Sequence, residues 1–226
     1  MDIVIPYSYD KHKGIELKYA LRSIDKYLDG YGEIFIVGHN PRGFKNFTHV
    51  SFPDNPERKE YSIMSKMKWA CGSPVVLDNF IMWHDDHFLL KPMHVRDFQY
   101  WTNGTLATAA SRAKGGYLLS LKNTIRYGIK ENFDIHTPIV FSKAQFLANV
   151  PMVFADGREY CVKSLYCRDA PGVSMSDCKI NAPLAPDAIR RKIEGRLFFS
   201  TGPLALTNPM IEIFDYLYPD PSRYEN

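Results

Sequence analysis

Four consecutive polar residues, His84, Asp85, Asp86 and His87, interrupt an apolar run in the segment NFIMWHDDHFLLKP. Two adjacent carboxylates repel one another, and burying either one without compensation is unfavourable by several kcal/mol. A divalent cation removes this repulsion and can also bridge a diphosphate group. Oxygen ligands suit Mg²⁺ or Mn²⁺, and an additional imidazole ligand from His84 or His87 favours Mn²⁺. A solvated β-turn, in which the aspartates bind nearby amides, is the structural alternative.

Two further residues have side chains that suit catalysis. His136, in the segment NFDIHTPIVF, could act as a general base on an acceptor hydroxyl, a role worth roughly 10²–10⁴-fold in rate. Alternatively, it is an ordinary histidine fixed by one hydrogen bond. Arg22, on an expected helix, could bind a phosphate through two parallel hydrogen bonds. Alternatively, it is solvated or forms an ion pair at the surface.

A basic and aromatic stretch follows the acidic pair. Between Phe98 and Lys130 the chain has no acidic residue. The basic and aromatic side chains there are Arg112, Lys114, Lys122, Arg126 and Lys130, with Tyr100, Trp101, Tyr117 and Tyr127. This mixture suits an acceptor that carries phosphate or sugar, and it also suits DNA. A solvated basic face is the alternative.

The elements that must position these residues alternate along the first part of the chain. Leu17, Leu21, Ile24 and Leu28 recur at spacings of four, three and four, which predicts an amphipathic helix. Strands are predicted at 2–6, 33–38, 48–52 and 80–83, and helices at 14–28 and 57–71. This order, with near-continuous apolar strands, predicts an α/β fold with a mostly parallel central sheet flanked by helices. Ligands of such sheets bind beyond the carboxyl ends of the strands, where residues 84–87 fall.

The second half of the chain is less regular. Residues 104–130 contain helix-compatible segments interrupted by Gly115-Gly116 and Gly128. A strand is predicted at 134–141 and a helix at 186–194. The sequence therefore predicts an elaborated C-terminal half.

Composition narrows the class of protein. The chain has 226 residues, 45% hydrophobic and 14% aromatic, which is ample for a packed core, and its formal charge of +3 is far from that of a dedicated nucleic-acid binder. Neither a signal peptide nor a membrane span is evident, so we expect a cytoplasmic protein. The four cysteines are Cys71, Cys161, Cys167 and Cys178, and their spacing fits no metal site. We therefore expect reduced thiols, and disulfides among the last three of them are the alternative. Phosphate-binding P-loop, dinucleotide-binding and nucleophile-elbow motifs are absent from the sequence.

Several segments together resemble the Stealth family of nucleotide-sugar-dependent transferases. IELKYALRSIDKYLDGYGEIFIVG is similar to one family segment, and FIMWHDDHFLL resembles its Asn-Asp-Asp stretch, with His84 where the family usually has Asn. DIHTPIVF resembles the His-x-Pro segment, and the tail RLFFSTGPLALTNPMIEIFDYLYPDPSRYE ends like the final family block. MDIVIPYSYD stands as a diverged opening strand, lacking the usual Tyr-Thr-Trp-Val-Asp pattern. Ser200-Thr201-Gly202 replaces an Asp-containing turn.

The resemblance implies a glycosyltransferase-A-like core, a nucleotide-diphosphate sugar as donor (a UDP-sugar) and a divalent metal, Mn²⁺ or Mg²⁺. By the same resemblance, Asp85 and Asp86 hold the metal, His136 is the catalytic base and Arg22 contacts the donor phosphate; Asp86 and Arg22 thereby take part in catalysis with His136. The residues assigned to the metal are Asp85, Asp86 and His87. Those assigned to the donor are Pro6, Tyr7, Arg22, Lys66 and Asp85.

We interpret the chain as one transferase domain, with residues 1–92 binding the nucleotide sugar and residues 93–226 binding the acceptor and carrying out catalysis. The compact chain resembles small phage- or bacterium-encoded transferases, and a phage-encoded enzyme would act in the host cytoplasm. The leading hypothesis is glycosyl transfer to the hydroxyl of a glycan, a lipid-linked sugar or a hydroxymethylated DNA base. Transfer of a sugar-1-phosphate, as in Stealth enzymes, is the close alternative. A catalytically degenerate nucleotide-sugar binder, or an interaction module, is the second alternative.

Overall fold

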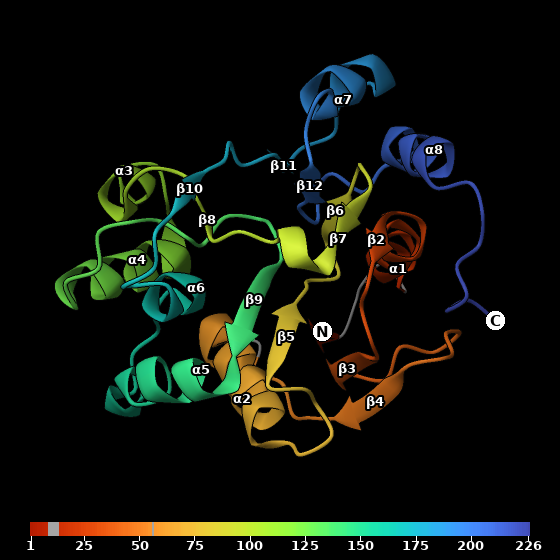
Figure 1. Ribbon diagram of the computed structural model, residues 1–226. Helices are drawn as coiled ribbons and strands as arrows, with labels where there is room; N and C mark the ends of the chain where they lie inside the picture. The colour runs from red at the N-terminus through yellow and green to blue at the C-terminus, as the bar shows by residue number, and fades with distance from the viewer. Residues whose placement is uncertain (9–13, 56) are drawn as a thin grey trace.

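The central sheet has five strands within residues 1–8, 14–55 and 57–226, which are the residues that the computed structural model describes (Figure 1). Their spatial order is β4 (Thr48–Ser51), β3 (Ile34–Gly38), β1 (Asp2–Tyr7), β5 (Asn79–Met82) and β9 (Ile139–Ser142). The first four strands run parallel, and β9 pairs with β5 in the antiparallel direction. The predicted α/β fold with a mostly parallel sheet is therefore confirmed. Residues 9 and 10 of the opening motif lie outside the described residues.

Helices cover both faces of this sheet. One face packs against α2 (Lys59–Gly72), α5 (Lys143–Asn149) and α6 (Val162–Tyr166), and the other against α1 (Ile15–Tyr27). Within β1, Val4 belongs to the first of these cores, whereas its neighbours Ile3 and Ile5 belong to the second. Successive side chains of a strand point to opposite faces, so a strand covered on both faces is apolar at nearly every position.

A smaller, three-stranded sheet contains the strand that follows β5 along the chain. Its order is β11 (Lys179–Ile180), β12 (Phe198–Thr201) and β6 (His87–Leu89). Strand β12 runs parallel to β11 and antiparallel to β6. Helices α7 (Pro186–Ile193) and α8 (Asn208–Leu217) pack on this sheet through a core that includes Phe88, Phe199 and Phe214. Because β6 follows β5 along the chain, the segment between them joins the two sheets (Figure 1).

Short elements complete the described part of the chain. The paired strands are β2 (Leu28–Asp29) with β7 (Met93–His94), and β8 (Trp101–Thr102) with β10 (Val173–Ser174). The remaining helices are α3 (Leu106–Ala110), α4 (Gly115–Arg126) and two 3₁₀ turns, Val95–Asp97 and Val153–Asp156. The predicted interruption at Gly115-Gly116 is in fact the start of α4, where Gly115 has a φ of +61°. The basic side chains predicted between 98 and 130 are all exposed.

The strand predicted over 134–141 is shorter than expected, since β9 begins only at Ile139. The preceding backbone is held by side chains instead of by a strand partner. The Asp134 carboxylate accepts hydrogen bonds from the backbone of α6, and the Lys163 ammonium binds the carbonyls of Ile135 and Thr137. These contacts replace ladder hydrogen bonds and turn residues 134–138 into a loop.

Two sequence-based expectations concern the chain as a whole. All four cysteines are buried free thiols, as predicted. Across the described residues, no helix combines the length and apolar character that crossing a membrane requires.

Candidate active site

The acidic pair lies in a turn at the carboxyl end of β5. The backbone N–H of His87 donates to the carbonyl of His84 at 3.1 Å, so Asp85 and Asp86 take the two central positions of the turn. Strand β5 runs parallel to β1, and the turn therefore lies at the edge of the sheet where ligands of α/β folds bind. The turn itself agrees with the structural alternative, but its position at this edge also agrees with a binding role.

The carboxylate of Asp86 faces cationic and imidazole groups. Its two oxygens lie 3.6 Å from His87 Nε2 and 3.5 Å from Lys179 Nζ on β11. Burial alone would raise the pKa of Asp86, but the Lys179 ammonium, together with other nearby positive charge, outweighs it, so the net pKa is lowered. Asp86 is therefore an ionised carboxylate, and 22% of its side chain remains exposed.

Three imidazoles surround this carboxylate. The ring centroid of His87 lies 4.9 Å from that of His84 and 6.3 Å from that of His136. Burial lowers the pKa of His84 to about 3 and lowers the pKa of His87 well below its usual range, so both rings are neutral near pH 7. His87 Nδ1 and Ser200 Oγ are buried without a hydrogen-bond partner among the described residues, and the two residues are paired across β6 and β12. Unpaired buried polar atoms are rare in proteins, so these two atoms are candidates for binding a ligand or an ordered water.

His136 is held by a carboxylate from a distant part of the chain. Its Nδ1 lies 2.7 Å from Asp177 Oδ2, and its backbone N–H donates to Asp177 Oδ1 at 3.1 Å. Burial alone would raise the pKa of Asp177, but the side-chain and backbone hydrogen bonds from His136 outweigh it and the net pKa is lowered. An ionised carboxylate on Nδ1 fixes the ring so that Nε2 carries the lone pair that a general base needs.

A buried lysine holds the loop that carries His136. Lys163 of α6 is 6% exposed, and its ammonium donates to the carbonyls on either side of His136, those of Ile135 and Thr137. The contact with Thr137 measures 2.9 Å. Two hydrogen bonds from one buried ammonium restrict the backbone at His136, so Lys163 holds the loop while Asp177 holds the ring.

The predicted donor residues of the first strand lie at the same edge of the sheet. Pro6 and Tyr7 end β1, opposite Val37 and Gly38 of β3. Lys66 of α2 is 1% exposed, and its ammonium donates to the Tyr7 carbonyl at 2.9 Å. The structure thus brings Lys66 to the carboxyl end of β1, a position that sequence spacing alone did not indicate.

Arg22 occupies a different environment from the one predicted. Its Nε and Nη2 donate to the two carboxylate oxygens of Glu225 at 2.7 and 2.8 Å, and its Nη1 donates to the Tyr218 carbonyl at 2.9 Å. The side chain is buried between α1 and the C-terminal tail. All three nitrogens therefore make structural contacts, which agrees with the ion-pair alternative and not with a phosphate contact.

Three residues of this site were not identified from the sequence: Lys163, Asp177 and Lys179. They lie in segments without a recognisable motif. Asp177 and Lys179 flank Cys178 at the start of β11, a strand of two residues that is too short to show a periodic pattern. The only sequence signal for Asp177 and Lys179 is that an acidic and a basic residue lie on either side of Cys178.

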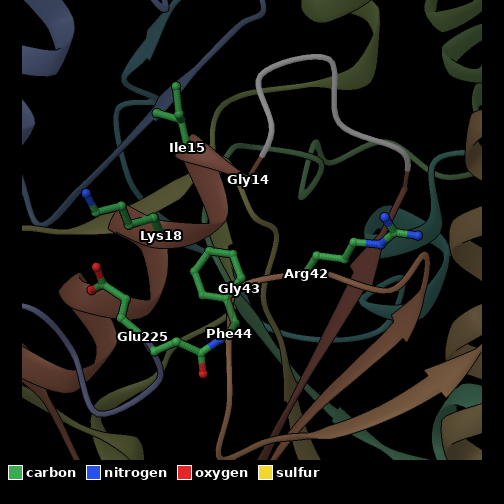
Figure 2. A pocket seen from close by; sticks show the side chains of 8 residues that line it. Gly14, Ile15, Lys18, Arg42, Gly43, Phe44 and Glu225 are labelled. Atoms are coloured by element: carbon green, nitrogen blue, oxygen red, sulfur yellow. The ribbon is translucent and has the colours of Figure 1, made fainter.

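A separate hollow of about 290 Å³ lies at the start of α1. Its lining residues are Gly14, Ile15, Lys18, Arg42, Gly43, Phe44, Glu225 and Asn226. Figure 2 shows the Phe44 ring between the Lys18 and Glu225 side chains and Arg42, whose guanidinium extends away from them. None of the residues predicted to take part in catalysis lines it, so we do not assign the reaction to this hollow.

The residues around the turn suit a hard divalent cation. Mg²⁺ and Mn²⁺ are commonly bound by one or two carboxylates together with substrate phosphates and water, and do not need a complete protein cage. Asp86 supplies an ionised, partly exposed carboxylate, with His87 Nε2 beside it. No group of three or more His, Cys, Asp or Glu side chains arranged around a metal position occurs in the described part of the chain. The donor set therefore fits a cation shared with a substrate better than a closed structural metal site.

Two solved structures share this architecture. The galactosyltransferase LgtC, in complex with donor and acceptor sugar analogues, matches with a TM-score of 0.55 and 12% sequence identity over 97% of this chain and 95% of that chain. An active-site mutant of LgtC matches with a TM-score of 0.54 and 11% identity over 96% and 95% of the two chains. No protein-family model matches the chain, and no curated protein matches it in sequence. The resemblance to the Stealth family thus stays a prediction, whereas the chain has the glycosyltransferase-A-type α/β fold that LgtC has.

Proposed function

We propose that the protein is a glycosyltransferase that moves a sugar from a nucleotide-diphosphate donor to an acceptor hydroxyl. The observation that carries this proposal is the pair formed by His136 and Asp177, next to Asp86 at the carboxyl edge of a glycosyltransferase-A-type sheet. A base and an ionised carboxylate at this edge of the sheet provide the two functions that the reaction needs. One deprotonates the acceptor, and the other helps to organise the leaving diphosphate.

His136 is the general base in this mechanism. Asp177 holds Nδ1, and Nε2 takes the proton of the acceptor hydroxyl as its oxygen attacks the anomeric carbon of the donor. The bond between that carbon and the diphosphate breaks, and the nucleoside diphosphate leaves. Asp177 also stabilises the imidazolium that forms, because an ionised carboxylate lies within hydrogen-bond distance of it.

Asp85 and Asp86 are the residues that would hold a divalent cation, with His87 beside them. When bound, Mg²⁺ or Mn²⁺ would neutralise the charge of the leaving diphosphate, a role usually worth several kcal/mol. Lys179 adds a positive charge on the same side, since its ammonium already lies 3.5 Å from Asp86. We assign Pro6, Tyr7 and Lys66 to the nucleoside end of the donor.

We assign residues 1–92 to donor binding and residues 93–226 to the acceptor and catalysis. The assignment is supported by the origin of the base, because His136, Asp177 and Lys163 all come from the second part. The exposed basic face of α4 suits an anionic or sugar-bearing acceptor, such as a glycan or a hydroxymethylated base in DNA. The exposed rings of Tyr117 and Tyr127 can stack on a sugar ring or on a nucleic-acid base.

Product analysis after incubation with nucleotide sugars and Mn²⁺ tests the proposal. Release of a nucleoside diphosphate supports glycosyl transfer, whereas release of a nucleoside monophosphate identifies transfer of a sugar-1-phosphate. A thermal-shift screen of nucleotide sugars, with and without Mn²⁺, comes first, because a ligand at 100 times its Kd adds about 2.7 kcal/mol of stability. A shift without product indicates a degenerate binder, and the absence of any shift contradicts the proposed function.

A further inference from the structure

One carboxylate outside the predicted site is unusually well held. Asp54 Oδ1 accepts hydrogen bonds from Lys66 Nζ at 2.5 Å, from Ser8 Oγ at 3.1 Å and from Ser62 Oγ at 3.1 Å. Three donors on one oxygen fix the position and the orientation of the whole carboxylate. A carboxylate held by several donors is typical of a ligand-binding side chain, whereas an isolated surface ion pair has one partner.

The lysine in this network is itself fixed by the backbone of the sheet. Lys66 Nζ also donates to the carbonyl of Tyr7, where β1 ends. It can do so because residue 38 is glycine: a Cβ at Gly38 would lie 1.9 Å from the Tyr7 oxygen and 2.8 Å from Lys66 Nζ, and Gly38 has a φ of +133°. A larger residue at this position would therefore disrupt both the strand end and the approach of Lys66.

The second oxygen of the Asp54 carboxylate accepts no hydrogen bond from the residues that the structure describes. Each hydrogen bond that Asp54 accepts within the described residues goes to Oδ1, and 27% of its side chain is exposed. Neutralising Lys66 requires only one of the two oxygens. A fixed carboxylate with one accessible oxygen is a strong acceptor for an O–H or N–H group of a ligand.

The position of this acceptor narrows the ligand group. Strand β1 has β3 on one side and β5 on the other, so the chain order reverses at the carboxyl end of β1, where nucleotides bind in open α/β sheets. Asp54 is linked to the end of β1 by Lys66, whose ammonium binds both Asp54 and the Tyr7 carbonyl, on the β3 side. Asp86 follows β5 on the opposite side. Adjacent strands lie roughly 5 Å apart, so the two carboxylates bracket a region in which a nucleoside diphosphate can extend from one to the other.

We propose that Asp54 binds the ribose of the nucleotide donor, with Oδ2 accepting hydrogen bonds from the 2′- and 3′-hydroxyls. This inference rests on the proposed function and identifies the donor as a ribonucleotide. An adjacent pair of hydroxyls suits a carboxylate better than a single base N–H does, because an ionised carboxylate is an acceptor only and can serve two donors. Acidic side chains bind ribose hydroxyls in the same way in dinucleotide-binding α/β folds.

Calorimetry with the full chain and Mn²⁺ tests this role without relying on turnover. The probes are UDP, CDP, GDP and ADP, followed by the 2′,3′-dideoxy form of whichever binds most tightly. We expect the wild type to bind the dideoxy form at least about tenfold more weakly, because hydrogen bonds to a charged group are lost. The Asp54→Asn variant is expected to bind the ribonucleotide about tenfold more weakly and to discriminate little between the two forms.

Asp25→Asn is the matched control, since Asp25 is a partly buried carboxylate paired with Arg223, and it should keep the discrimination of the wild type. Equal binding of both sugar forms by the wild type overturns the inference, and this result does not require any variant to fold. Full discrimination in Asp54→Asn also overturns it and leaves a structural ion pair with Lys66. Failure of the wild type to bind any of the four nucleotides is a different result, because it contradicts the proposed function itself.

Discussion

The imidazole of His136 and the carboxylate of Asp177 meet at 2.7 Å although 41 positions separate them in the chain. The same carboxylate also accepts the backbone N–H of His136, so it fixes both the ring and the peptide that carries it. A histidine held in this way has one defined tautomer and one defined direction for proton transfer. This relationship turns an ordinary-looking histidine into the best candidate for a general base in the described structure.

Removing the base should affect turnover far more than binding. We expect His136→Ala to lower kcat by roughly 10²–10⁴-fold, because general base catalysis contributes about that much. Steady-state kinetics with the donor identified by the thermal-shift screen is the measurement, and calorimetry should show nearly unchanged donor affinity. His94→Ala, which changes a half-buried 3₁₀-helix cap, serves as the control. A loss below tenfold for His136→Ala would make His136 a structural histidine.

Asp177→Asn keeps the size of the side chain but removes its charge. We expect kcat to fall by about 10²-fold or more, because an amide no longer stabilises the imidazolium and can favour the wrong tautomer. The pH profile of kcat should change as well, which distinguishes this role from a purely structural one. Asp169→Asn, a largely exposed carboxylate paired with Arg168, should behave like the wild type. Equal kinetics for the two variants would argue against the role of Asp177.

The acidic turn makes a prediction about metal dependence. We expect Asp86→Ala to lose transfer almost completely while the protein remains folded, because the variant lacks the carboxylate proposed to share a cation with the donor diphosphate. Circular dichroism checks the fold, and EDTA should abolish wild-type turnover, with Mn²⁺ or Mg²⁺ restoring it. Undiminished wild-type turnover in EDTA would eliminate the metal role of Asp85 and Asp86.

Lys163→Met should reduce both stability and turnover. The variant leaves the carbonyls of Ile135 and Thr137 without their buried donor, which we expect to destabilise the fold by about 1–3 kcal/mol. For a chain of this size each kcal/mol lowers Tm by roughly 2–4 °C. The loop around His136 should loosen, so kcat should decrease more than KM increases. Lys192→Met, at an exposed position of α7, should change neither quantity.

The contact between Arg22 and Glu225 makes stability depend on pH. Burial alone would raise the pKa of Glu225, but the hydrogen bonds from Arg22 and from the Ser222 backbone outweigh it, and the net pKa is lowered. A carboxyl with a lower pKa in the folded state stabilises the protein above its unfolded pKa, about 4.3 for Glu, and loses this effect as pH falls through the folded value.

Thermal unfolding of Glu225→Gln and the wild type between pH 7 and pH 3 measures this effect. We expect the difference in unfolding free energy to be largest near pH 7 and to shrink below about pH 4. Donor binding should remain intact in Arg22→Ala, although its stability should fall by about 3–5 kcal/mol, as when one partner of a buried ion pair is removed. Glu212→Gln, an exposed residue of α8, is the control. A difference that is constant with pH, or loss of donor affinity in Arg22→Ala, would contradict the structural role.

The sequence by itself determined the strands and helices of the first half. Continuous apolar runs and a helical spacing are local signals, and they predicted β1, β3, β4 and β5 with α1 and α2 to within a few residues. The position of the acidic turn followed from the end of a buried strand. His136 was singled out by its residue type and by the resemblance, and its ring lies 6.3 Å from that of His87.

Only the tertiary structure decided which side chains work together. Asp177 contacts His136 although 41 positions separate them, and Lys163 of α6 binds the same loop. Arg22 donates to Glu225, which lies 203 positions away in the chain. Asp54 gained its role from the three donors that converge on one of its oxygens. Polar contacts of this kind depend on how distant segments pack, and no periodicity in the sequence records them. The partners of these side chains could therefore be assigned only from the folded structure, in which distant segments of the chain lie together.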